Sequence, residues 1–320
     1  MTIDPALLGA VERSRAAWPV PGHELPLDTW RERYEALVAA ARAPGPGNIE
    51  RLDRIVGSRA VRVRIYRPSS EIGPLSALVY FHGGGWVIGS IESHDDIIAD
   101  IAHDSGCLVV SVDYSRAPEH RFPVAFDEGC EVLDWLVAEA RTLGVDSERL
   151  FVGGDSAGGN LATAIALADS GHERRLAGQV LLYPCVDTDF SRASYRRGVD
   201  APFLSSGEMT WFWDQYAPSP DVRRDPFAVP LRATAGQLSR LPPTFVATAE
   251  HDPLFDEGCA FAARLRRAGR PVRHEPGLGM VHGFIRLRRQ ATEPARIYRA
   301  MCDWIRDCPA RARSPDEWVE

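Results

Sequence analysis

Short apolar runs alternate along this chain with stretches of helical pattern, and this rhythm constrains the fold more than any other feature. The apolar runs are VRVRIYRP (61–68), LSALVYF (75–81), CLVVSV (107–112), RLFVGG (149–154), QVLLYP (179–184) and PTFVATA (243–249). Helical stretches such as 126–144 and 160–171 lie between most of them. Buried strands that alternate with helices predict an α/β fold, in which helices cover both faces of a mostly parallel sheet.

Two regions depart from this rhythm. Residues 1–45 include a helical pattern at 28–42 with Asp28 as its expected N-cap, and 190–235 are rich in aromatic residues and prolines. An insertion between two strands of such a sheet is a natural lid or cap. The sequence therefore predicts a core of 46–189 and 236–312, a helical cap of 1–45 and 190–235, and a weakly held tail, 313–320.

The charge of the chain excludes several classes of function. With 37 basic and 44 acidic residues, its net charge is −7, which is not the electrostatic footprint of a nucleic-acid-binding protein. Every basic residue is arginine, and lysine is absent from the sequence. A Schiff-base mechanism, attachment of pyridoxal phosphate and a P-loop lysine are therefore excluded. We expect no cofactor.

The six cysteines are scattered, and no C-x-x-C pair occurs. This pattern predicts buried free thiols in a reducing compartment rather than a metal site or a disulfide framework. The start of the chain lacks the pattern of a signal peptide, and no run of 18 apolar residues predicts a membrane span. We therefore expect a cytoplasmic protein.

Ser156 stands in FVGGDSAGGN (151–160), directly after a predicted strand and before a predicted helix. A sharp strand-to-helix turn needs small residues two positions to either side, and Gly154 and Gly158 supply them. Such a turn presents the serine oxygen above the sheet, beside the positive end of the helix. The alternative is an ordinary glycine-rich turn that contains a serine by chance, but the strand and helix flanks favour a nucleophile.

Three consecutive glycines follow another predicted strand, in FHGGGW (81–86). Glycine lets the backbone approach a ligand closely, and backbone N–H groups fixed in advance can stabilise an oxyanion. A flexible loop would explain the glycines equally well if they stood alone. The serine turn in the same sheet favours the oxyanion role.

A serine nucleophile needs a base, and His282 is the histidine best placed to serve. It lies in the glycine-flanked loop GLGMVHGF after the last predicted strand, whereas His274 lies within that strand, VRHEP. We expect the remaining histidines that we considered to lie on the surface: His23, His94, His103 and His172.

The acid that orients the base has more candidates. Asp252 follows the strand PTFVATA in a loop, where it is free to meet a histidine. Asp256 heads the next helix and is explained as its N-cap, and Asp187, also past a strand end, is the reserve candidate. We therefore predict Asp252.

In this order along the chain, HGGGW, DYSRAPEH, GDSAGGN, HDPLFDEG and MVHGF resemble the motifs of the bacterial hormone-sensitive-lipase-like (family IV) carboxylesterases. The resemblance covers nearly the whole chain. It implies an α/β-hydrolase fold, with a mostly parallel eight-stranded sheet flanked by helices and a helical cap. It also implies Ser156 as nucleophile, Asp252 as acid, His282 as base, and an oxyanion hole of Gly83, Gly84 and Ala157.

One motif departs from the family pattern. The family reads DYRLAPEH where this chain reads DYSRAPEH, so Ser115 and Arg116 stand out of pattern. This departure concerns the packing around Asp113 and Glu119 rather than the triad. The resemblance also implies a small-molecule ester of short to medium chain length as substrate, and it is compatible with a homodimer.

Three functions fit this resemblance. The first is a serine esterase that forms an acyl-enzyme, and the second is an amidase or formamidase with the same triad. The third is a non-catalytic receptor, as in the plant gibberellin receptors that share this fold, but a receptor has no reason to keep His282. Trp86, Trp211 and Trp213 are candidates for an apolar substrate pocket, although aromatic residues at helical spacing more often pack a cap onto its core.

Overall fold

The computed structural model describes residues 2–71, 73–170 and 175–310. Its centre is an eight-stranded sheet with the strand order β1-β2-β4-β3-β5-β6-β7-β8. The strands are β1 (Ile49–Val56), β2 (Val61–Pro68), β3 (Leu75–Phe81), β4 (Leu108–Asp113), β5 (Val145–Asp155), β6 (Leu176–Leu182), β7 (Thr244–Ala247) and β8 (Val272–Glu275). Only β2 runs against its neighbours, so the sheet is mostly parallel, which confirms the predicted fold class.

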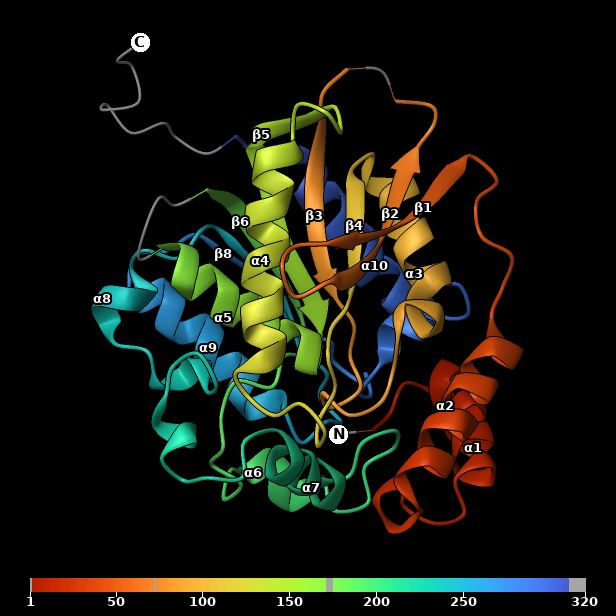
Figure 1. Cartoon of the computed structure of the whole chain (residues 1–320). Helices are drawn as coiled ribbons and strands as arrows, with labels where there is room; N and C mark the ends of the chain where they lie inside the picture. Colours follow the sequence, from red (N-terminus) through yellow and green to blue (C-terminus); the bar gives the residue numbers. More distant parts are fainter. Residues whose placement is uncertain (1, 72, 171–174, 311–320) are drawn as a thin grey trace.

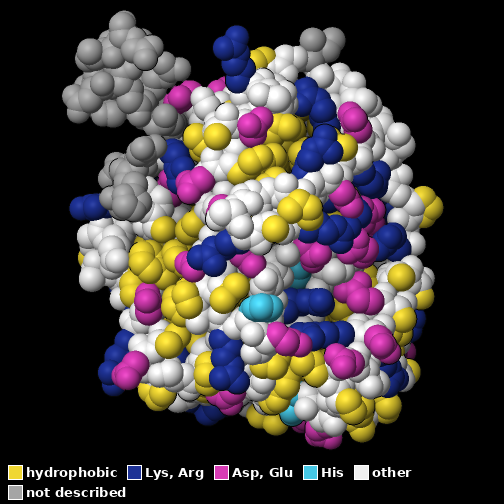
Figure 2. Space-filling model, viewed as in Figure 1, with side chains coloured by type: hydrophobic (Ala, Val, Ile, Leu, Met, Phe, Trp, Pro, Cys, Tyr) yellow, Lys and Arg dark blue, Asp and Glu magenta, His cyan; other side chains and the backbone are white. Residues whose placement is uncertain are grey.

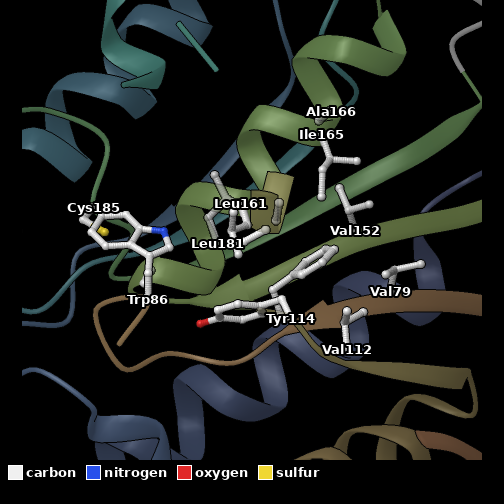
Figure 3. Close-up of a cluster of buried hydrophobic side chains, with 14 of the residues drawn as sticks. Val79, Trp86, Val112, Tyr114, Val152, Leu161, Ile165, Ala166, Leu181 and Cys185 are labelled. Carbon is white, nitrogen blue, oxygen red and sulfur yellow. The ribbon is translucent and has the colours of Figure 1, made fainter. Parts of the chain in front are cut away.

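Helices cover both faces of this sheet (Figure 1). On one face lie α4 (Val124–Glu139), α5 (Ala157–Ser170), α8 (Ala235–Leu238) and α9 (Phe255–Arg267); on the other lie α3 (Ile91–Ser105) and α10 (Thr292–Asp307). Each face encloses its own apolar core, and Figure 3 shows part of the core beneath α5. The central strands β3 and β6 are buried along their whole length, which explains their unbroken apolar sequences.

The remaining helices gather at one end of the sheet, at the carboxyl ends of the parallel strands (Figure 1). They are α1 (Leu8–Ala17), α2 (Leu27–Ala41), α6 (Ala193–Arg197) and α7 (Ser206–Tyr216). Short 3-10 helices fill the connections: η1 (Pro5–Leu7), η2 (Gly22–Glu24), η3 (Val222–Arg224), η4 (Pro230–Arg232) and η5 (Phe284–Leu287). The carboxyl ends of parallel strands are where α/β proteins place their ligands. The predicted tail, 313–320, lies outside the described residues.

Two expected helix caps are wrong. Helix α2 begins at Leu27 behind Pro26, so Asp28 lies in its first turn. Helix α9 begins at Phe255 behind Leu254, and the carboxylate of Asp256 instead accepts a hydrogen bond from the amide of Ser194. Asp256 therefore binds α6 to α9 rather than capping its own helix.

The cysteines are free, as predicted, and four of the six are buried. Basic and acidic side chains alternate over the face shown in Figure 2, so this face carries no large patch of one sign. No helix among the described residues is both long and apolar enough to cross a membrane.

Candidate active site

Ser156 occupies the turn between β5 and α5, and its backbone is in the left-handed region with φ of +56°. The two flanking glycines are required by contacts that leave no room for a side chain. A Cβ on Gly154 would lie 2.4 Å from the carbonyl oxygen of Phe81, and a Cβ on Gly158 would lie 1.9 Å from the same oxygen. This turn thus packs directly against the end of β3, where the glycine loop begins; we use this name for residues 82–90, between β3 and α3.

His282 and Asp252 meet, although thirty residues separate them in the chain. The Nδ1 atom of His282 lies 2.7 Å from Oδ2 of Asp252, and the other carboxylate oxygen accepts the amide of Leu254 at 2.9 Å. The Asp252 side chain is fully buried, whereas that of His282 keeps 13% of its surface exposed. A buried carboxylate on Nδ1 leaves Nε2 of the ring free to act as a base.

Contacts between the two loops hold this pair in place. The amide of His251 donates to the carbonyl of Met280 at 2.8 Å, and His251 pairs with Val281 in a short parallel bridge. The tip of β6 links the pair to the nucleophile. The amide of Ser156 donates to the carbonyl of Leu182 at 2.8 Å, and the ring of the next residue, Tyr183, lies 4.8 Å from the His282 ring.

The rival acids have other partners. Asp187 pairs with Arg192 and accepts the amide of Thr188. Glu257 is fully buried and accepts the amides of Val186 and Asp187, and burial raises its pKa well above the usual range. Asp187 and Glu257 therefore hold the segment after β6 in place, and neither is paired with His282.

The glycine loop differs in one respect from the expected oxyanion hole. The amide of Gly83 donates to Oδ1 of Asp155 at 3.0 Å, so it is already engaged. Among the described residues, the amides of Gly84 and Gly85 donate to no protein acceptor. Ala157 is the first residue of α5, and its amide has no acceptor within the helix. The available donors are therefore Gly84, Gly85 and Ala157 rather than Gly83, Gly84 and Ala157.

The DYSRAPEH segment, residues 113–120, forms hydrogen bonds with the glycine loop. The hydroxyl of Tyr114 donates to the carbonyl of His82 at 2.8 Å, and the guanidinium of Arg116 donates to the carbonyl of Gly89 at 3.0 Å. The hydroxyl of Ser115 donates to Glu128 at 2.5 Å. The two residues that depart from the family pattern thus have defined partners, and one of them binds the glycine loop itself.

Trp86 and Trp213 pack helix α7 against the segment after β3, whereas Trp211 packs α7 against α2. Trp86 and Trp213 are fully buried, and the ring of Trp86 stacks on Tyr216 with centroids 4.2 Å apart. Trp211 is half-buried and lies 5.4 Å from the ring of Trp30 on α2. Figure 3 shows Trp86 beside Cys185 at the edge of the core. These contacts favour packing over substrate binding for Trp86 and Trp213.

His94, which we expected on the surface, is fully buried. Its Nε2 atom lies 3.5 Å from Oδ1 of Asp155 and 3.0 Å from the guanidinium of Arg286. The sequence analysis assigned no role to any of the three: Asp155 lies in the GDSAGGN motif, which we interpreted for Ser156 alone, and no motif marks His94 or Arg286. Of the other histidines, His23 is half-buried, His103 is exposed, and His172 lies outside the described residues.

The comparisons with known proteins agree with this geometry. Residues 78–286 match a family model described as the alpha/beta hydrolase fold. The chain is 38% identical to an ethyl acetate hydrolase of Pseudomonas putida over 90% of this chain and 93% of that protein. It is 39% identical to the carboxylesterase NlhH of Mycobacterium tuberculosis over 72% of each. This chain belongs to the hormone-sensitive-lipase-like family of α/β-hydrolases.

Solved structures of this family agree as well. A thermostable esterase from Pseudomonas putida superimposes with a TM-score of 0.90 at 32% identity, covering 96% of this chain and 98% of that one. The esterase of Pyrobaculum calidifontis superimposes with a TM-score of 0.86 at 34% identity, covering 96% and 98%. The family assignment makes this chain a carboxylic ester hydrolase. In the part of the chain that the structure describes, no group of three or more His, Cys, Asp or Glu side chains is placed to hold a metal ion.

Proposed function

We propose that this hydrolase cleaves short- to medium-chain carboxylic esters through an acyl-enzyme, with Ser156 as nucleophile, His282 as base and Asp252 as the orienting acid. The observation that carries the proposal is the contact of 2.7 Å between Nδ1 of His282 and Oδ2 of Asp252. Both residues lie in loops at the end of the sheet where the turn with Ser156 in the left-handed region also lies. Hydroxyl, imidazole and carboxylate in this arrangement are the machinery of acyl transfer.

The reaction takes two steps. In the first, Nε2 of His282 removes the proton of Ser156 while Oγ attacks the ester carbonyl carbon, and the amides of Gly84, Gly85 and Ala157 stabilise the resulting oxyanion. The alcohol leaves with the proton that His282 returns to it. In the second, a water molecule loses a proton to His282 and attacks the acyl carbon. The bond to Oγ then breaks and the acid leaves, while His282 passes the proton to Oγ and restores the Ser156 hydroxyl.

The test is a rate series on p-nitrophenyl esters of increasing acyl length. We expect Ser156→Ala to lower kcat by about three or more powers of ten on every ester that the wild type hydrolyses. Activity near wild type in this variant would remove the assignment. Turnover of matched ester and amide substrates separates the esterase from the amidase alternative, and we expect the ester to be strongly preferred.

We propose that 1–45 and 190–235 act as a cap over this site. The position of α1, α2, α6 and α7 beyond the carboxyl ends of the strands supports it (Figure 1). The free cysteines support a cytoplasmic location, since thiols persist in reducing compartments. A homodimer stays a prediction, which sedimentation velocity would test.

A further inference from the structure

Asp155, the residue before the nucleophile, is a buried carboxylate that orders the glycine loop. Its Oδ1 atom accepts hydrogen bonds from the amide of Gly83 at 3.0 Å and from the hydroxyl of Tyr80 at 2.9 Å. Burial alone would raise the pKa of Asp155, but the charges of His94 and Arg286 and these hydrogen bonds hold it well below its usual range. The carboxylate that fixes the loop therefore depends on positive charge supplied from outside the loop.

Arg286 is placed to supply that charge. It lies on η5, four residues after His282, and its Nη2 atom lies 3.0 Å from Nε2 of His94. His94 in turn lies 3.5 Å from Asp155, so the histidine stands between the two charges. Two carboxylates interact electrostatically with Arg286, that of Asp155, which lies beyond His94, and that of Asp96. Part of its charge therefore acts on Asp155 across His94.

The same guanidinium reaches helix α2 of the proposed cap. Its Nη2 atom donates to the hydroxyl of Tyr34 at 2.9 Å, and its Nη1 atom donates to the carbonyl of Ser93 at 2.9 Å. The base loop, as we name residues 276–287 after β8, therefore meets helices α2 and α3 at this one side chain.

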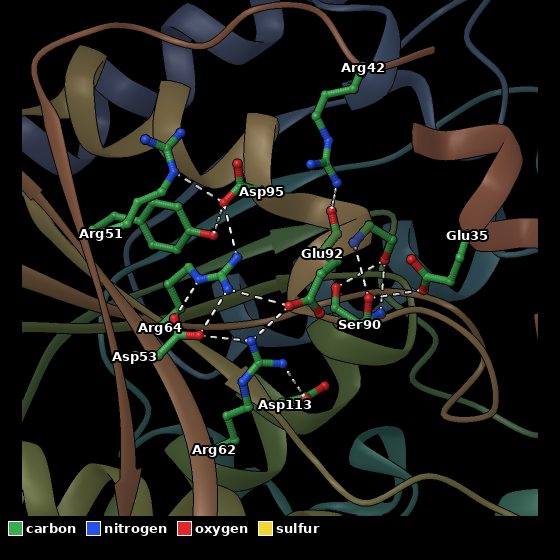
Figure 4. Close-up of polar contacts among 12 residues, drawn as sticks. Glu35, Arg42, Arg51, Asp53, Arg62, Arg64, Ser90, Glu92, Asp95 and Asp113 are labelled. Atoms are coloured by element: carbon green, nitrogen blue, oxygen red, sulfur yellow. Dashed lines mark hydrogen bonds and ion pairs between the residues drawn. The ribbon is translucent and has the colours of Figure 1, made fainter. Parts of the chain in front are cut away.

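Helix α2 also contacts the far side of the glycine loop. Arg31, Tyr34 and Glu35 lie on one face of the helix, since residues three and four apart are neighbours. Arg31 donates to the carbonyl of Val87 at 2.9 Å. Glu35 accepts a hydrogen bond from the hydroxyl of Ser90 at 3.0 Å (Figure 4). This face of α2 therefore forms hydrogen bonds with the glycine loop and, through Tyr34, with Arg286 of the base loop.

We propose that Arg286 is a positioning residue of this hydrolase: through His94 and Asp155 it fixes the oxyanion donors, and through Tyr34 it ties their position to helix α2. The proposal rests on the proposed triad and oxyanion hole. Removing Arg286 takes away one of the two positive neighbours of Asp155, and the acceptor that holds the amide of Gly83 becomes less firmly fixed. Donors displaced by a fraction of an ångström stabilise the transition state less, whereas binding of the neutral ester changes little.

The test compares Arg286→Met and Arg286→Lys with Arg289→Met, a matched control at an exposed arginine three residues further along the chain. We expect Arg286→Met to lower kcat on p-nitrophenyl butyrate about ten- to hundredfold while KM stays within about threefold, and Arg286→Lys to recover part of that loss. Arg289→Met should retain wild-type kcat. Equal kcat in Arg286→Met and Arg289→Met would overturn the proposal, and so would a loss confined to KM.

A second, milder variant keeps the proposal testable if Arg286→Met does not fold. Tyr34→Phe removes one hydroxyl, and Tyr298→Phe is its control because the Tyr298 hydroxyl binds Asp104 far from the site. We expect Tyr34→Phe to lower kcat about three- to tenfold, and the effect to vanish in the Arg286→Met background, since both act through one contact. A kcat equal to that of Tyr298→Phe would overturn the link to α2. Wild-type turnover and the inactive Ser156→Ala variant show separately whether the triad assignment holds.

Discussion

The carboxylate of Asp252 holds Nδ1 of His282 at 2.7 Å from a fully buried position. The other oxygen of this carboxylate is occupied by the amide of Leu254, so the side chain has little freedom to turn. A carboxylate fixed in this way selects the histidine tautomer that leaves Nε2 unprotonated, and in the proposed mechanism it stabilises the imidazolium that forms during the reaction.

Asp252→Asn should therefore lower kcat by about 10³–10⁴-fold with little loss of stability. An asparagine is the same size, but its amide group can donate to Nδ1 and hold the ring in the wrong tautomer. Asp187→Asn is the matched control, because Asp187 pairs with Arg192 instead. The measurement is kcat on one p-nitrophenyl ester for both variants. A comparable loss in Asp187→Asn, with Asp252→Asn active, would reverse the choice of acid.

The sequence predicted those parts of the fold in which burial shapes the residue pattern. The run VRVRIYRP coincides with β2, and the other predicted apolar runs all contain or overlap strands. Strand β1 was missed because half of the residues in IERLDRIV are charged, and only its end residues, Ile49 and Val56, are buried. An edge strand that is held by its pairing with β2 leaves almost no apolar signal in its own sequence.

The candidate site shows the same limit. The motifs led to Asp252 and His282 because each follows a strand end in a loop. They could not tell which of three adjacent glycines is already engaged, since that depends on where the side chain of Asp155 points. Nor could they find His94 and Arg286, because a buried polar contact between distant segments has no local signature.

His82, the first residue of the glycine motif, should make the protein sensitive to acid. The ring is fully buried and stacks on Tyr114, and its Nδ1 lies 2.8 Å from the carbonyl oxygen of Gly83. Burial, and after it the neighbouring His94, lower the pKa of His82 to about 3. In the unfolded chain His82 has an ordinary pKa of about 6.5, so it binds a proton at a pH at which the native state leaves it neutral. Stability is therefore lost as pH falls below about 6.5.

His82→Gln should remove this part of the acid sensitivity. Each pH unit between about 6.5 and 3 costs the wild type up to about 1.4 kcal/mol through this residue, or roughly 2 kcal/mol at pH 5. Replacing His82 will itself destabilise the protein at pH 7, but the gap to wild type should narrow by roughly that amount at pH 5. Urea unfolding of both proteins at pH 7, 6 and 5 measures the gap. A gap of constant size would contradict the prediction.

Gly158 is where the nucleophile helix and the glycine loop come closest, and it should tolerate no side chain. A Cβ there would lie 1.9 Å from the carbonyl oxygen of Phe81 and 2.8 Å from that of His82, and both are backbone atoms that cannot swing aside. Gly158→Ala must push α5 away from β3, which separates Ser156 from the oxyanion donors. We expect a loss of more than about 2 kcal/mol in stability together with a fall in kcat.

Gly47→Ala, where nothing lies within 4 Å of the new Cβ, should change stability by no more than about 0.5 kcal/mol. The measurements are thermal unfolding and kcat of Gly158→Ala and Gly47→Ala. Equal stability and equal kcat in the two variants would show that the turn around Ser156 has more room than these contacts indicate.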